Sequence, residues 1–99
     1  MSLNLRGLAG VFTNSTAVVE AIEVGPTTAA LLCPEDKDRL FARIHNDAGT
    51  LWVKLGPDCS RTDFTYRLSL NTAVEIQGYT GIITAIKLSG TTTVYVTTF

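Results

Sequence analysis

Residues 39–99 divide into six short segments in which apolar side chains recur at every second position. This is the period of a β-strand with one buried face. Turn-forming Gly, Asn, Asp, Ser and Pro residues separate the segments. The pattern predicts an antiparallel β unit in which two sheets face each other across their apolar rows. The expected strands lie within 39–47, 50–56, 64–70, 72–78, 82–88 and 92–98.

Each segment supplies one row of side chains that we expect to face the core. Two of the connections, residues 46–49 and 89–91, carry the residues of tight β-hairpin turns, and we expect hairpins there. The expected core rows are Leu40, Ala42 and Ile44; Leu51, Val53 and Leu55; Phe64, Tyr66, Leu68 and Leu70; Val74 and Ile76; Ile82, Ile86 and Leu88; and Val94 and Val96.

Two further strands are expected before this unit. Residues 16–24 fit a strand by alternation, although helical spacing also groups Val18, Val19 and Ile22. The β-branched content favours the strand. Residues 27–33 form the second segment, which Pro34 ends. We therefore predict an all-β chain, with a single small antiparallel β-sandwich, or a partly open barrel, of about six to eight strands over residues 16–99.

Residues 1–15 have no clean period and are predicted to form an extended N-terminal arm. Its apolar residues require an apolar partner to offset their exposure. The alternative is a frayed terminus, or a short first strand packed on the domain's own core. The apolar residues of the arm are Leu3, Leu5, Leu8, Val11 and Phe12.

The composition restricts the partners that this chain can have. Only 17% of its residues are charged while 45% are hydrophobic, which suits a surface covered by another protein. A Thr-rich β protein with no such partner fits equally well, because Thr favours strands. The net charge of −1, with Lys and Arg scattered singly, argues against nucleic-acid binding. No apolar run approaches the length of a membrane span.

The sequence holds no arrangement typical of a catalytic, cofactor-binding or metal-binding site. His45 is the only histidine, and Cys33 and Cys59 lie in separate segments without the paired spacing of a zinc site. The acidic residues at 35–38 lack the pattern of a Ca²⁺-binding loop. We therefore predict that the chain is not an enzyme and has no small-molecule substrate.

The two cysteines could form a disulfide, and the sequence alone does not decide this. Residues 1–12 contain Arg6 and no sustained apolar stretch, so they do not resemble a secretory signal. Synthesis in a reducing cytoplasm is then expected, and with it two free thiols.

Trp52 lies between two residues of a core row, Leu51 and Val53, and so it points to the opposite side of its strand. We expect it on the outer face of the domain or at an interface, where Trp is enriched.

Residues 39–99 resemble small virion proteins of tailed bacteriophages, of the capsid decoration (cement) type. The resemblance rests on the segments RLFARIHN, LWVKLG, YRLSL, VEI, YTGIITAI and TVYVT. The chain departs from the usual pattern at residues 70–72, where Leu-Asn-Thr replaces a Pro-Gly turn.

This resemblance implies a structural protein on the capsid surface of a virion, made in the host cytoplasm and bridging major capsid subunits. It also implies association with other copies, with a homotrimer as the expected form. A head–tail connector or tail component is an alternative within virion proteins. From another class, a carbohydrate- or ligand-binding β-sandwich would use Trp52 and the tyrosines as platforms. The expected interface anchors are Leu3, Leu5, Leu8, Phe12 and Trp52.

Overall fold

Eight β-strands and no helix make up residues 17–99, the part of the chain described by the structure, a computed structural model. The prediction of an all-β sandwich is confirmed, and residues 16–24 supply a strand, not a helix. The strands are β1 (Val18–Val24), β2 (Ala30–Cys33), β3 (Phe41–Asn46), β4 (Leu51–Lys54), β5 (Tyr66–Leu68), β6 (Thr72–Gln77), β7 (Ile83–Lys87) and β8 (Thr92–Thr98).

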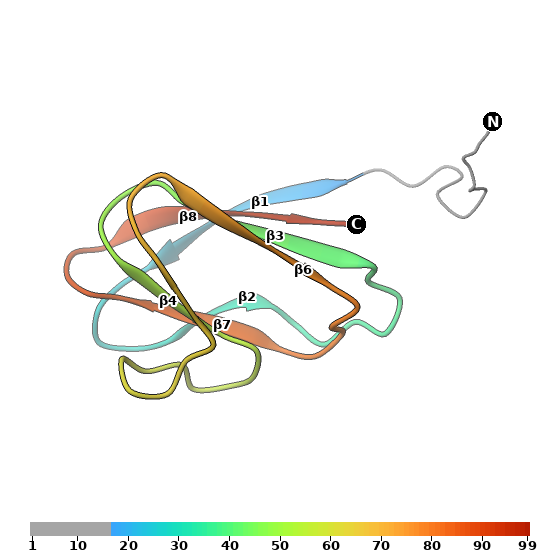
Figure 1. Cartoon of the computed structure of the whole chain (residues 1–99), viewed down its shortest axis with the longest axis horizontal. Coiled ribbons are helices and arrows are strands. Elements are labelled where there is room, and N and C mark those ends of the chain that lie inside the picture. The colour runs from blue at the N-terminus through green and yellow to red at the C-terminus, as the bar shows by residue number, and fades with distance from the viewer. Residues whose placement is uncertain (1–16) are drawn as a thin grey trace.

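The strands form two four-stranded antiparallel sheets stacked face to face (Figure 1). Sheet I has the order β1-β8-β3-β6, and sheet II has the order β2-β7-β4-β5. Successive strands alternate between the sheets everywhere except at β4 and β5, which are neighbours in sheet II. Two four-stranded sheets connected in this way form a jelly roll.

The turns at 46–49 and 89–91 reverse the chain as predicted, but neither closes a hairpin. β3 pairs with β6 and β8, whereas β4 pairs with β5 and β7, so the 46–49 turn crosses between sheets. The 89–91 turn likewise joins β7 of sheet II to β8 of sheet I. Gly49 and Gly90 have φ angles of 68° and 71°, which glycine adopts without strain. The hairpin prediction is wrong because turn chemistry sets a reversal and does not choose the pairing partner.

The core lies between the inner faces of the two sheets. It includes most of the predicted rows, and burying each aliphatic side chain contributes about 1.5–3 kcal/mol. Leu40, Phe64, Leu70 and Leu88 are exceptions, because all four are exposed at or near strand ends. The core consists of Val24, Leu32, Cys33, Ala42, Ile44, Leu51, Val53, Leu68, Ile76, Ile83, Ala85, Val94 and Val96.

The predicted core row of β7 is wrong. Ile83 and Ala85 face the core, followed in the same row by Lys87, while Ile86 lies on the opposite face of sheet II. All five residues of β7 are buried, so both faces of this strand carry apolar side chains and neither stands out. Lys87 also occupies an inward position, and because a charged residue is not expected there, the alternation did not identify the inward row.

Candidate interaction surface

The histidine and the two cysteines lie in three different parts of the domain and do not form a catalytic cluster. His45 lies on the outer face of β3, with its Nε2 3.7 Å from Oδ1 of Asp47. Cys33 is in the core between the sheets, and Cys59 is buried in a separate cluster on the outer face of sheet II; both are free thiols. Within residues 17–99, no group of three His, Cys, Asp or Glu side chains is placed to hold a metal ion. The same part of the chain has no helix long and apolar enough to span a membrane.

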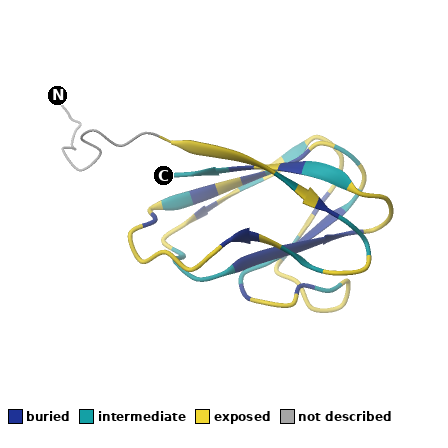
Figure 2. Cartoon of the chain, turned by 180° about the vertical axis from the view of Figure 1, so that it is seen from behind, coloured by how far each residue is buried: buried dark blue, intermediate teal, exposed yellow. Residues whose placement is uncertain are grey.

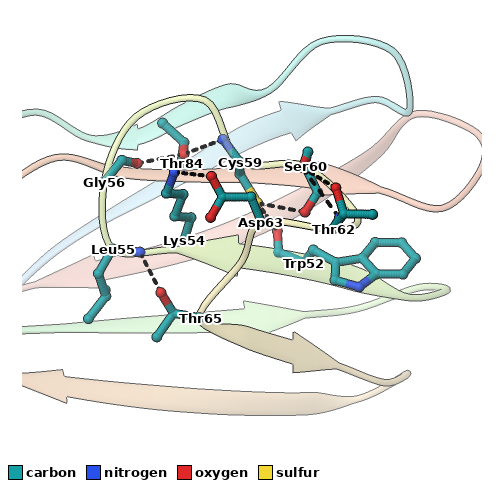
Figure 3. Close-up of polar contacts among 10 residues, drawn as sticks. All are labelled: Trp52, Lys54, Leu55, Gly56, Cys59, Ser60, Thr62, Asp63, Thr65 and Thr84. Atoms are coloured by element: carbon teal, nitrogen blue, oxygen red, sulfur yellow. Dashed lines mark hydrogen bonds and ion pairs between the residues drawn. The ribbon is translucent and has the colours of Figure 1, made fainter.

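Residues 55–65, which we call the capping loop, cover the outer face of sheet II at β4 and β7 (Figure 3), whereas Leu31 on β2 remains 52% exposed on the same face. Thr84 of β7 fixes it, since its Oγ1 donates to the carbonyl of Gly56 at 2.7 Å and accepts from the amide of Cys59 at 3.1 Å. Lys54 Nζ pairs with Oδ2 of Asp63 at 2.6 Å, and this hydrogen bond raises the pKa of Lys54. The loop is therefore attached to both β4 and β7.

Trp52 packs beneath this loop. Its side chain contacts Cys59 and Ile86, Phe64 meets its ring edge-on at 6.4 Å, and the guanidinium of Arg61 lies 5.9 Å from the ring centroid. Trp52 is on the outer face of its strand, as alternation predicts, but it is only 8% exposed. The surface expected of an interface anchor is thus occupied by the chain itself.

The stability of the domain should depend on pH through the thiol of Cys59 in the capping loop. Burial raises the pKa of its thiol from 9.0 to about 11. In the unfolded chain the thiol ionises first, so its contribution to stability is complete below pH 9 and is lost as the pH rises toward 11. We expect the stability advantage of the wild type over Cys59→Ala to fall by about 1 kcal/mol between pH 8 and pH 10. Urea unfolding of both proteins at the two pH values measures this, and a constant difference would contradict the buried thiol.

The outer face of sheet I, which we call the open face, is not covered by any part of residues 17–99. Tyr95 of β8 lies at its centre, between Ala21 on β1 and His45 on β3, and is 42% exposed. Val19 on β1 is 63% exposed. Figure 2 shows β1, the strand that follows the N-terminal trace, mostly in the colour of exposed residues. The outward residues of the four strands are Val19, Ala21, Glu23, Phe41, Arg43, His45, Ala73, Glu75, Gln77, Thr93, Tyr95 and Thr97.

The open face carries three charged residues, Glu23, Arg43 and Glu75, among small, Thr and aromatic side chains. Arg43 and Glu75 pair across β3 and β6, with 3.8 Å between Nε and Oε2, and largely neutralise each other. His45 has Asp47 beside it, and Glu23 lies toward the end of β1. Small, Thr and aromatic side chains cost little free energy to cover, whereas Lys and Glu cost more.

Two cations, Arg39 and Lys87, are buried in the sandwich without a carboxylate in contact among the described residues. Arg39 precedes β3 and is 5% exposed. Its Nη1 donates to the carbonyl of Pro34 at 3.0 Å, and its Nη2 donates to those of Tyr79 at 3.0 Å and Gly81 at 2.7 Å. Arg39 thereby ties the connections that lead into β3 and β7.

Lys87 is buried at the other end of β3, with 1% of its surface exposed. Its Nζ donates to Oδ1 of Asn46 at 2.7 Å and to the carbonyl of Ala48. Burial lowers the pKa of Lys87, and the charge of Asp47 opposes this effect. Asn46 Nδ2 in turn donates to three backbone carbonyls, those of Gly49, Leu68 and Ser69.

The remaining predicted anchors, Leu3, Leu5, Leu8 and Phe12, lie outside the described residues. Sequence reasoning missed the open face because it depends on which strands are neighbours. It missed the two buried cations because a single Arg or Lys in a strand is typical of a solvent-facing position. No protein-family model, curated protein or solved structure matches this chain.

Proposed function

We propose that this chain is a non-enzymatic structural protein of a tailed-phage particle, specifically a capsid decoration protein that bridges neighbouring major capsid subunits. The phage assignment comes from the sequence resemblance of residues 39–99. The jelly roll occurs in viral capsid domains, but also in lectins and cupins, so the fold alone does not select this function. One structural observation carries the proposal: the chain's own loop covers Trp52 on the outer face of sheet II, whereas the outer face of sheet I is left uncovered by residues 17–99 and exposes Tyr95 and Val19.

The mechanism is passive binding through the open face. Tyr95 and Val19 would be desolvated against a neighbouring subunit, with the flanking Thr side chains tolerating burial at low cost. A single contact of this size would be weak. Repetition over many equivalent positions of a closed shell, and association with other copies as a homotrimer, would strengthen attachment through avidity.

Charging the open face should remove the chain from particles. We expect the double substitution Ala21→Lys and Tyr95→Lys to lower occupancy at least tenfold, since two ammonium groups would be desolvated at the contact. Occupancy is measured by quantitative mass spectrometry of purified particles. Leu70→Lys is the control, because Leu70 is also exposed but lies in the turn between β5 and β6. Unchanged occupancy of the double variant would overturn the proposal.

Deleting residues 1–12 should weaken shell binding and leave the β domain folded. The eight strands and the core lie within residues 18–98, so the deletion leaves all of them in the chain. Particle occupancy and the urea midpoint of the truncated chain test the two halves of this prediction. Wild-type occupancy would contradict the role of the arm in attachment.

The copy number per particle, obtained from the same mass spectrometry, distinguishes a decoration protein from a connector or tail component. A decoration protein is present in hundreds of copies, on the order of the number of capsid subunits, and a connector or tail component in few. A carbohydrate-binding module would bind a glycan array. No observation favours this last function, because its expected platform, Trp52, is covered by the capping loop.

A further inference from the structure

β1 lies at one edge of sheet I, and no strand within residues 17–99 pairs with its outer side (Figure 1). With seven residues it is the longest of the edge strands. Val18 and Val19 are 54% and 63% exposed there. The outer side of an edge strand presents a row of unpaired backbone N–H and C=O groups, which is a template for a further strand. The chemistry of this edge therefore fits a β-strand as its occupant.

The other three edges of the sandwich are shorter or interrupted. β2 has four residues, with a register shift between Leu31 and Cys33 and with Pro34 directly after it. β5 has three residues. β6 has six, but Glu75 in it is held in an ion pair with Arg43. Short strands, bulges and charges are features that keep edges unpaired. β1 runs in continuous register with β8 and contains no proline or lysine.

The hydrogen bonds of sheet I show which backbone groups of β1 face outward. Phe41 and Phe99 exchange backbone hydrogen bonds of 3.3 Å and 3.1 Å, so the backbone groups of Phe99 point toward β3. These directions alternate along a strand, so the even-numbered residues of β8 bond to the even-numbered residues of β1. The backbone groups of Val19, Ala21 and Glu23 consequently point to the free edge.

We propose that β1 pairs in antiparallel fashion with β1 of a second copy, about a twofold axis at Ala21. In this register Ala21 faces Ala21 of the second copy, and Val19 faces Glu23. Each of these facing pairs exchanges two hydrogen bonds, so the outward backbone groups from Val19 to Glu23 are satisfied on both copies. The two four-stranded sheets become one continuous sheet, with both open faces on the same side.

The positions of the acidic residues select this register. A centre at Glu20 or at Glu23 would place like charges directly opposite each other, which destabilises a strand pair. A centre at Ile22 would place Val19 opposite a residue beyond the end of the strand. With the centre at Ala21, Glu20 faces Ile22 and Glu23 faces Val19, so no two carboxylates are directly opposed. The strand is thus complementary to itself, which favours a second copy as its occupant.

Glu20 is the residue that opposes this pairing. It occupies an inward position, and an inward charge is one of the features that discourage the extension of a sheet. In the proposed register the two copies of Glu20 are diagonal neighbours, at a separation of about 7–8 Å. Glu20→Gln should therefore lower the dissociation constant of the pair, by about threefold. A higher dissociation constant in this variant would contradict the register.

This inference concerns the free protein and does not rest on the proposed function. The edge of β1 accepts one strand, so the homotrimer proposed for the particle would use other surfaces. The mass of the free protein tests the pairing, whereas particle occupancy tests the proposed function. The failure of one proposal is therefore distinguishable from the failure of the other.

Sedimentation equilibrium of the full-length chain is the first measurement. We expect a mass of two chains in concentrated samples and of one chain on dilution. Hydrogen exchange followed by NMR gives the location of the contact. The amides of Val19, Ala21 and Glu23 should be protected in the concentrated sample and should lose this protection on dilution.

A charge exchange tests the register itself. Val19→Glu should raise the dissociation constant about tenfold or more, because it creates two direct oppositions of carboxylates in each pair of chains. Adding Glu23→Lys should restore association, since each new carboxylate then faces an ammonium group. Ala73→Glu is the matched control, because Ala73 faces outward on β6, at the other edge of sheet I. It should leave the dissociation constant unchanged.

Four outcomes would overturn the proposal. A single chain at every concentration would show that the copies do not pair, and protected edge amides in that monomer would assign the edge to the chain itself. A mass of three chains would exclude a twofold pair. An equal effect of Ala73→Glu would assign the contact to β6 of the neighbouring copy. Association that Val19→Glu weakens and Glu23→Lys does not restore would exclude the facing of these two positions.

Discussion

Asn46→Ala should lower the free energy of unfolding by about 3 kcal/mol, a large part of the 5–15 kcal/mol typical of a small domain. The substitution removes the side-chain acceptor of the buried Lys87 ammonium, whose hydrogen bond to Oδ1 is 2.7 Å long. It also removes the donor that serves the carbonyls of Gly49, Leu68 and Ser69. Hydrogen bonds to charged groups contribute about 1.5–3 kcal/mol each, and an unpaired buried charge costs more. Urea unfolding at pH 7 measures the change.

Lys87→Met is the matched control, because it removes the charge and keeps a side chain of similar length. We expect it to change stability by about 1 kcal/mol or less, since replacing a buried charge by an apolar group is often neutral. The double variant should be more stable than Asn46→Ala alone, and the double-mutant cycle gives the coupling between the two side chains. An Asn46→Ala protein as stable as the wild type would contradict a charged, buried Lys87.

The loss in free energy of unfolding caused by Asn46→Ala should also become smaller at alkaline pH. Burial lowers the pKa of Lys87 in the folded state, so the unfolded chain binds more protons between the folded pKa and the ordinary value near 10.4. Stability from this group therefore rises with pH across that interval, and the rise should be larger when Asn46 is absent. The ionisation of the two thiols affects both proteins alike and cancels in the difference between them.

Alternation of apolar residues was sufficient to predict an all-β sandwich and most of its core rows. Val94 and Val96 of β8 alternate with exposed Tyr95, so one face of that strand is identified from sequence. The inward row of β7 was predicted wrongly because both faces of the strand are buried, one by the core and the other by Trp52 and the capping loop. Periodicity distinguishes two faces only where one of them meets water.

Turn residues predicted where the chain reverses but not which strands pair. The 46–49 segment has the composition of a hairpin turn, yet it carries the chain from β3 in sheet I to β4 in sheet II. The pairing is decided by burying the apolar rows of both sheets at once, which is a property of the whole chain. The same limit applies to the open face, whose members come from four strands that are distant in sequence.

The candidate site was predicted only in part for a similar reason. Trp52 was correctly expected to point away from the core, because direction follows from its neighbours in the strand. Its cover was not predictable, since Cys59, Phe64 and Ile86 approach it from a loop and from another strand. Residues that are near in space but separated in sequence leave no local pattern.

Trp52→Ala should destabilise the domain by about 3–5 kcal/mol, the usual cost of truncating a buried Trp. The indole lies against Cys59 and Ile86, with Phe64 and Arg61 beside it, so its loss would leave a cavity beneath the capping loop. An anchor that faced a partner instead would leave the free chain almost as stable as the wild type. Thermal unfolding followed by far-UV circular dichroism distinguishes the two roles.

Tyr95→Ala provides the comparison on the other sheet. Tyr95 is 42% exposed on the open face, so we expect its truncation to cost the free chain about 1 kcal/mol or less. For occupancy of the particle, we expect the larger loss from Tyr95→Ala, measured at a temperature where both variants remain folded. If Trp52→Ala left the free chain stable and removed it from particles, the indole would be an interface anchor and the capping loop would have to open on binding. The opposite result places the contact surface on sheet I and assigns the capping loop to stability alone.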